Sequence, residues 1–127
     1  MNANYILLYV ENVPRSRDFY QRLLDLRPVE DSDTFVLFVL PSGVKLGLWG
    51  KNGVIPAANA PGGFELGIPV ESAGDVDRLA GEWQTGAWKE SGVRIIQEPV
   101  DMDFGRTFTA CDADGHRLRV FFPGAGQ

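Results

Sequence analysis

The sequence predicts an α+β protein made of two tandem modules, each a strand, a helix and then three strands. A strand that ends at Val10 is followed by a helix start, and the same pattern returns at Val70, 60 positions later. A glycine turn that leads into an alternating strand occurs at residues 41–50 and again at residues 113–122. A segment rich in Gly, Pro, Asn and Ala separates the copies. We therefore expect one domain, residues 1–127, with modules 1–50 and 63–123 and a linker at 51–62.

The first module begins with an alternating strand at residues 5–10, whose two faces carry Ile6, Leu8 and Val10 on one side and Tyr5, Leu7 and Tyr9 on the other. Asn12 suits a helix N-cap, and Pro14 suits the first helical turn. Apolar residues at helical spacing follow, namely Phe19, Tyr20, Leu23 and Leu24. We expect a short strand at 27–30, a turn at 31–33, an apolar strand at 34–40 and a last strand up to Gly50.

The second module repeats this order. A strand is expected at residues 64–70, and Ser72 can cap a helix whose apolar positions are Val76, Leu79, Ala80 and Trp83. Residues 84–92 are expected to form a longer loop or a helix extension. Strands are expected at 94–97 and 107–111, followed by an Asp-Ala-Asp-Gly turn and a final strand.

Composition and charge narrow the function. A hydrophobic content of 44% and a charged content of 23% are typical of a globular domain. A net charge of −5 without a basic stripe argues against a nucleic-acid partner. The single cysteine, Cys111, excludes a disulfide framework. No membrane-spanning run and no basic signal-peptide start are visible, so we expect a soluble cytoplasmic protein without a membrane partner.

Two segments carry a resemblance to a known family. Residues 9–20 (YVENVPRSRDFY) resemble the first strand and helix of the vicinal oxygen chelate superfamily, and residues 112–116 (DADGH) resemble its last turn. This superfamily includes glyoxalase I, extradiol dioxygenases and bleomycin-resistance proteins. The resemblance implies the glyoxalase/bleomycin-resistance fold, in which curved mixed sheets surround a cup.

A closer resemblance is to the phenazine-antibiotic resistance proteins. Its residues are Leu48-Trp49, the segment from Gly74 to Glu82-Trp83, and residues 103–108 (DFGRTF) before the Asp-Gly-His turn. Members of that group bind and sequester the drug, and they form homodimers. The apolar strand at 34–40 suits such pairing.

The metal-dependent enzymes of the superfamily hold a divalent cation in the cup. When the strand segments of both modules are aligned with the family pattern, Tyr5, Gly47, Glu65 and Arg119 fall at the four positions of the metal ligands. Only one carboxylate is among them, and Arg119 would repel a cation. We expect no metal, no cofactor and no catalytic residue. His116 is expected in the turn and Cys111 as a buried thiol.

Period-two alternation predicts which side chains line the cup. The aromatic residues Tyr5, Tyr9, Trp49 and Phe121 can stack on a flat ring. Gly47 would let a flat ligand approach the backbone. Lys45 or Arg119 can pair with a carboxylate, although Arg119 is equally able to neutralise Glu65. Phe104, Arg106 and Phe108 form a second aromatic-basic cluster. Trp49 can also be a core or dimer residue, and Trp88 can cover the cup or pack a loop.

We therefore expect a metal-free protein that sequesters a planar aromatic antibiotic or a similar compound, possessing no enzymatic activity. The alternatives are a metal-dependent enzyme of the glyoxalase or dioxygenase type and a structural dimer with a filled cup. The sequence leaves the identity of the ligand open.

Overall fold

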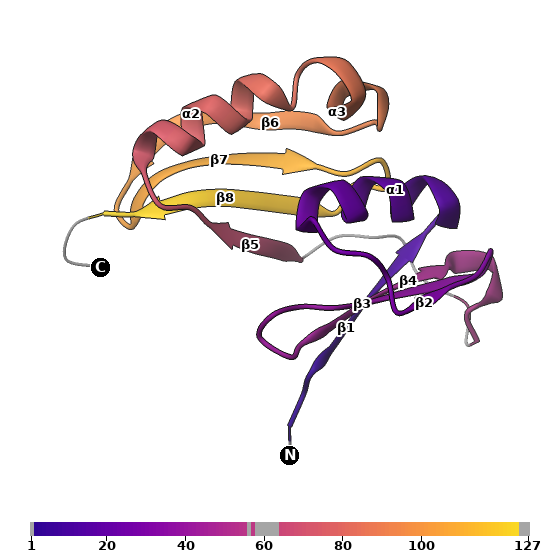
Figure 1. The fold of residues 1–127 in the computed structure, drawn as a ribbon. Coiled ribbons are helices and arrows are strands. Elements are labelled where there is room, and N and C mark those ends of the chain that lie inside the picture. The colour runs from indigo at the N-terminus through magenta and orange to yellow at the C-terminus, as the bar shows by residue number, and fades with distance from the viewer. Residues whose placement is uncertain (1, 56, 58–63, 125–127) are drawn as a thin grey trace. The chain divides into compact units, whose positions relative to one another are not determined.

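The computed structural model describes residues 2–55, 57 and 64–124. The chain divides into two compact units, residues 1–60 and 61–127, which are called module 1 and module 2 below. Each module is a four-stranded mixed sheet with helical cover, so the α+β fold is confirmed (Figure 1). Most of the linker predicted at 51–62 lies outside the described residues. Its start, Lys51–Gly53, forms a short 3-10 helix.

Module 1 contains the strands β1 (Tyr5–Val10), β2 (Glu30–Asp31), β3 (Phe35–Val39) and β4 (Lys45–Gly50), and the helix α1 (Val13–Leu24). The strand order is β1-β4-β3-β2. β1 runs parallel to β4, and the other neighbours are antiparallel. The predicted apolar strand at 34–40 is therefore an inner strand, although β2 pairs with it only at Val36 and Leu37.

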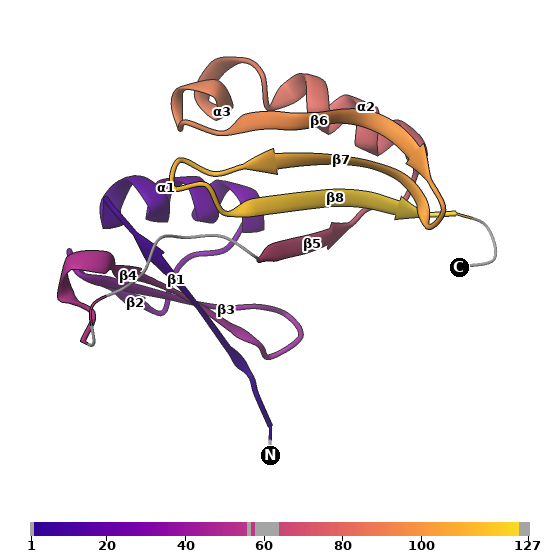
Figure 2. The same ribbon diagram turned by 180° about the vertical axis from the view of Figure 1, so that it is seen from behind.

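Module 2 contains β5 (Glu65–Pro69), β6 (Arg94–Met102), β7 (Gly105–Cys111) and β8 (Arg117–Pro123), with the helices α2 (Ala73–Glu82) and α3 (Gly86–Glu90). Its order, β5-β8-β7-β6, repeats that of module 1. The one parallel pair is again the first and last strands. α2 lies along one face of this sheet, in contact with β6, β7 and β8, as Figures 1 and 2 show from opposite sides.

Both long helices start where the sequence predicts. The Asn12 side chain accepts a hydrogen bond from the Arg15 backbone N–H at 3.0 Å, and Ser72 caps α2 by accepting from Asp75 at 3.1 Å. Each cap satisfies a backbone donor that the first helical turn leaves unpaired, which contributes about 1 kcal/mol. α1 ends at Asp25 in the left-handed conformation (φ 54°).

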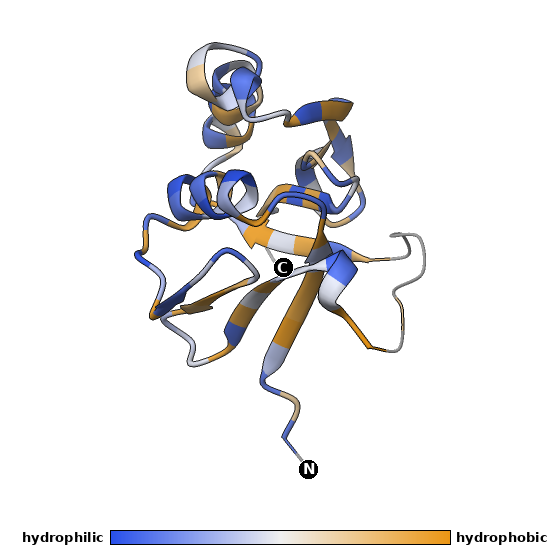
Figure 3. Cartoon of the chain, turned by 90° about the vertical axis from the view of Figure 1, so that its right-hand side faces the viewer, coloured by the Kyte–Doolittle hydropathy of each residue, from blue (hydrophilic) through white to orange (hydrophobic). Residues whose placement is uncertain are grey.

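The core of each module lies between its sheet and its helix. In module 1, β1 and β4 bury Leu8, Val10, Leu46 and Leu48 on the face that α1 covers with Phe19 and Tyr20. In module 2, Leu118, Val120 and Phe108 meet Val76, Ala80 and Trp83 in the same way. Each buried aliphatic side chain contributes roughly 1.5–3 kcal/mol. In Figure 3 the helices are mostly hydrophilic blue, and the strands carry the orange stretches.

Two predicted strands differ from the structure. β6 runs to Met102 and not to 97, because the strand continues through Pro99, a residue that usually marks the end of a strand. β2 is Glu30–Asp31, later than the predicted 27–30. Residues 84–92 contain the helix α3, where Trp88 stacks on Trp83 at 5.2 Å between ring centroids. Among the described residues, no helix is long and apolar enough to cross a membrane.

Candidate functional site

The face of the module 1 sheet opposite α1 is aromatic and open. The parallel register sets Tyr5 beside Lys45, Leu7 beside Gly47 and Tyr9 beside Trp49. Tyr5 is 56% exposed and Tyr9 is 39% exposed. Trp49 makes edge contacts with Tyr9 and Phe35, each at 6.3 Å between ring centroids. The side chains on this side of the sheet are called the module 1 face, namely Tyr5, Leu7, Tyr9, Phe35, Lys45, Gly47 and Trp49. On this face the Trp49 ring is positioned by its edge contacts with Tyr9 and Phe35.

Lys45 lies over one of these rings. Its Nζ is 5.0 Å from the centre of the Tyr5 ring. A cation over an exposed aromatic face gains about 0.5–1 kcal/mol. The ammonium is therefore held beside the aromatic surface, where it can interact with a bound ring or with an anion.

Gly47 does not leave the backbone open as expected. A Cβ built on Gly47 would lie 2.7 Å from Leu7 Cδ2 and 3.1 Å from Phe35 Cε1. The space above the glycine is therefore occupied by the protein's own side chains. A flat ligand reaches this backbone only after Leu7 moves, and Leu7, at 44% exposure, has room to do so.

The open face of module 2 is organised by an ion pair. Arg119 Nε donates to Glu65 Oε2 at 2.9 Å, and Nη2 donates to Oε1 at 3.0 Å. These bonds hold the pKa of the Glu65 carboxyl below its usual range and raise that of Arg119. Sequence reasoning left open whether Arg119 pairs with Glu65 or with a ligand. In this structure it pairs with Glu65 in the bidentate geometry that Arg favours.

Polar residues that sequence reasoning missed complete this network. Arg119 Nη1 donates to Gln97 Oε1 at 3.3 Å and to Thr107 Oγ1 at 3.4 Å. Thr109, 2% exposed, donates to the same Gln97 oxygen at 2.9 Å. Since Thr109 pairs with both Arg119 and Gln97 in the sheet, strand register would have revealed the group.

One aromatic ring lies close to Arg119. Its guanidinium carbon lies 5.8 Å from the centre of the Phe104 ring, and Phe104 meets Phe121 edge to face at 6.1 Å. Gly67 lies beside Arg119, and a Cβ there would be in ordinary contact with Phe121 at 3.6 Å. The module 2 face is defined as Glu65, Phe104, Arg119 and Phe121 together with the polar residues of the network, Gln97, Thr107 and Thr109.

The predicted cluster of Phe104, Arg106 and Phe108 is not brought together. Arg106 points to the helix side, where it forms ion pairs with Asp77 of α2 at 2.9 Å and with Asp101 at 3.0 Å. Phe108 is fully buried against Trp83 under the same helix. The cation beside Phe104 is Arg119. The expectation failed because Phe104 lies in the turn before β7, out of phase with the strand.

The residues present do not fit the divalent cation that enzymes of this kind hold. Within the described part of the chain, no three His, Cys, Asp or Glu side chains gather into a possible metal site. Glu65 is engaged by a guanidinium, and a cation would have to displace it against like-charge repulsion. A metal-dependent enzyme, the alternative raised by the sequence, has no described ligand set here.

The cysteine ends β7, and the histidine lies in the turn that follows. His116 donates its backbone N–H to Asp112 Oδ1 at 2.8 Å, and Asp114 does the same at 2.9 Å. This closes the turn between β7 and β8, and His116 is buried there rather than on the surface. Cys111 is a buried free thiol, as expected.

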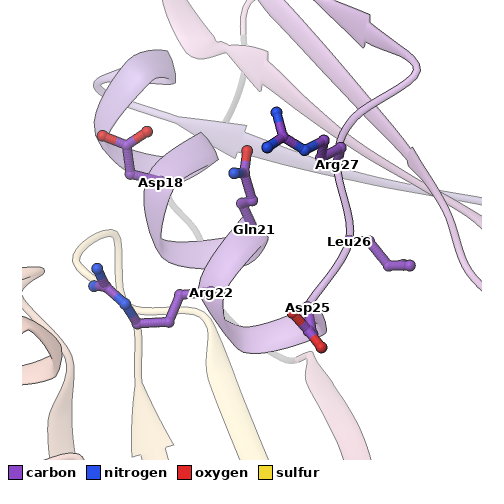
Figure 4. A pocket seen from close by; sticks show the side chains of 6 residues that line it. All are labelled: Asp18, Gln21, Arg22, Asp25, Leu26 and Arg27. Carbon is purple, nitrogen blue, oxygen red and sulfur yellow. The ribbon is translucent and has the colours of Figure 1, made fainter.

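A hollow of about 630 Å³ lies elsewhere in module 1. It lies beside the C-terminal end of α1 and the loop that follows. The side chains that line it, shown in Figure 4, are Asp18, Gln21, Arg22, Asp25, Leu26 and Arg27. None of the predicted site residues lines it. Its lining has no aromatic ring, so it does not suit a flat aromatic guest.

Comparison with known proteins gives the family. Residues 2–120 match the Glyoxalase/Bleomycin resistance protein/Dioxygenase superfamily. The chain belongs to this superfamily. The predicted fold is thereby confirmed. A solved structure of a glyoxalase-related enzyme from Fulvimarina pelagi, 20% identical, has the same fold with a TM-score of 0.80 over 98% of this chain and 93% of that one.

Two relatives are much more similar in sequence. The phenazine antibiotic resistance protein EhpR of Enterobacter agglomerans is 38% identical over 120 residues, which cover 94% of this chain and 91% of the relative. The solution structure of protein ATC0852 from Agrobacterium tumefaciens is 46% identical, with a TM-score of 0.85 over 98% of this chain and 99% of that one.

Proposed function

We propose that this protein binds and sequesters a planar aromatic antibiotic or a similar compound, and protects by binding rather than by chemistry. The observation that carries the proposal is the module 1 face, where Trp49 stands half-buried between Tyr9 and Phe35, and the rings of Tyr5 and Tyr9 are exposed. The likeness to a phenazine antibiotic resistance protein supports the same reading.

Ring contact supplies the affinity in this proposal. Each aromatic pair contributes about 0.5–1.5 kcal/mol beyond burial of its area. Sequestration needs a dissociation constant near or below the free drug concentration, and micromolar binding corresponds to about −8 kcal/mol. Several stacked rings together with the burial of a tricyclic guest are sufficient for this. No metal or cofactor is required.

The proposed binding residues come from both open faces. They are Tyr5, Tyr9, Lys45, Gly47 and Trp49 on the module 1 face, and Glu65, Phe104, Arg119 and Phe121 on the module 2 face. Arg106 is not included among the proposed binding residues, because its ion pairs with Asp77 and Asp101 hold it on the side of the sheet that α2 covers.

The proposal includes a cytoplasmic homodimer. The exposed side chains of Tyr5, Leu7 and Val39 add apolar surface to the open face of module 1, which a second chain can cover. Light scattering after gel filtration measures the mass directly. A monomer at micromolar concentration would remove this part of the proposal and leave ligand binding to be judged by itself.

Tryptophan fluorescence tests the binding. Titration with phenazine or phenazine-1-carboxylate is expected to quench emission, because a flat ring stacked on Trp49 opens a non-radiative path. In Trp49→Phe most of the quenching should disappear. Trp88→Phe is the matched control, since Trp88 stacks on buried Trp83 at the helix side. If tryptophan emission does not change and calorimetry detects no heat of binding, the proposal is contradicted.

A further inference from the structure

The guanidinium of Arg119 has almost no donor left for a ligand. Of its five N–H groups, two bind Glu65 and the two on Nη1 face Gln97 and Thr107. The side directed to Glu65 is the paired edge that a ligand carboxylate would use. The protein's own carboxylate thus fills the position of an anionic guest.

Charge leads to the same conclusion. Glu65 neutralises Arg119 locally, and its side chain is 36% exposed against 21% for Arg119. An incoming carboxylate would meet the negative charge of Glu65 beside the cation it seeks. To bind Arg119 it would have to break two short charge-assisted hydrogen bonds.

The network beneath holds the guanidinium in place. Thr107 is fully buried and donates to the Val120 carbonyl at 2.8 Å, while Thr109 fixes the Gln97 oxygen that Arg119 also uses. The guanidinium is planar and restrained in its plane, and the Phe104 ring centre lies 5.8 Å from its central carbon, so it offers a flat group suited to an aromatic ring.

We propose that Arg119 serves the module 2 face as a flat stacking surface for an aromatic ring, and that it does not bind the anionic group of a ligand, because Glu65 occupies that position. The inference rests on the proposed function and adds the class of guest: this face selects a ring system and is indifferent to a negative charge on it.

The test uses two probes with one ring, phenazine and phenazine-1-carboxylate. Their affinities for the full chain are measured by calorimetry, and the ratio of the two affinities is followed through the variants. In the double variant Arg119→Gln/Glu65→Gln, which removes both charges of the pair, both affinities should fall, with the ratio unchanged within about threefold. In Glu65→Gln the released guanidinium should shift the ratio at least about tenfold toward the carboxylate.

Glu98→Gln is the matched control, because Glu98 is an exposed carboxylate of β6 that forms no ion pair within the described residues. It changes the net charge equally and should leave the ratio unaltered. If the double variant does not fold, Arg119→Lys replaces it: the charge opposite Glu65 stays, the flat fork is lost, and both affinities should again fall together.

The outcomes separate the two proposals. A tenfold fall of the ratio in Arg119→Gln/Glu65→Gln, or the same ratio in Glu65→Gln as in the wild type, would overturn the role of Arg119 while binding itself stands. Absence of binding by either probe would instead remove the proposed function. The expected pattern of ratios supports both.

Discussion

Glu65 accepts two parallel hydrogen bonds from Arg119 across neighbouring strands, at 2.9 and 3.0 Å. They lower the pKa of the carboxyl in the folded state below its ordinary value of 4.5. A group with a lowered folded pKa stabilises the fold above its unfolded pKa and loses that contribution as the pH falls through the folded value. The pair should therefore stabilise the protein at neutral pH and cease to do so in acid.

Glu65→Gln should accordingly lower the free energy of unfolding at pH 7 by about 0.5–1 kcal/mol, a value already reduced for solvent screening. The difference from the wild type should shrink below pH 4. Urea unfolding at a series of pH values measures it, and Glu98→Gln should differ little from the wild type at pH 7. A difference that stays constant into strong acid would show that the ion pair is not its source.

The glycine of β4 offers a test of packing. Because Leu7 Cδ2 lies 2.7 Å from where a Cβ would be, Gly47→Ala should destabilise module 1 by about 1 kcal/mol, the low end for overpacking. In a Leu7→Ala background the same change should cost clearly less. Equal costs in both backgrounds, measured by denaturant unfolding, would mean that Phe35 and not Leu7 limits the space.

The second glycine, Gly105, begins β7 directly after the turn that presents Phe104. Gly105 has φ 134°, and a Cβ there would collide with the carbonyl oxygen of Phe122 and lie 2.8 Å from the Gly124 backbone nitrogen. Gly105→Ala should thus cost at least about 2 kcal/mol.

Gly81 is the control for Gly105. It lies in α2 with nothing within 4 Å of a Cβ, so Gly81→Ala should stabilise the protein by about 0.5–1 kcal/mol. Thermal unfolding of both variants is sufficient to compare them. A neutral Gly105→Ala would show that the turn can rearrange.

Much of the fold was predictable because its signals are local. Asn12 and Ser72 cap helices through their own side chains, and alternation along 5–10 and 45–50 separates a core face from an open face. The extension of β6 was not predictable, because Pro99 usually marks the end of a strand, whereas this strand continues to Met102.

The sequence predicted which side of each sheet the site residues occupy, but it did not predict the contacts between their side chains. Period two places Tyr9, Trp49 and Arg119 on the sides opposite the helices, where the register puts them. It carries no information on side-chain rotamers, so the cover of Leu7 over Gly47 was missed. It also fails at a turn, which is why Phe104 was grouped with the wrong arginine.

A variant of Arg106 tests whether this residue lies outside the proposed binding site. Its guanidinium binds Asp101 and Asp77, which raises its pKa, and it joins the turn region of β6 and β7 to α2. Arg106→Gln should lower the melting temperature slightly, because both ion pairs are exposed. It should leave the affinity for phenazine unchanged, since the side chain lies on the helix side of the sheet.

Phe104→Leu is the counterpart on the open face. It keeps an apolar side chain but removes the ring that contacts Phe121 and underlies the Arg119 cation, so phenazine should bind more weakly by up to about tenfold. Calorimetric titration of both variants with the same phenazine stock gives the comparison. If Arg106→Gln weakens binding as much as Phe104→Leu, Arg106 contacts the guest, and its assignment to the helix side alone is wrong.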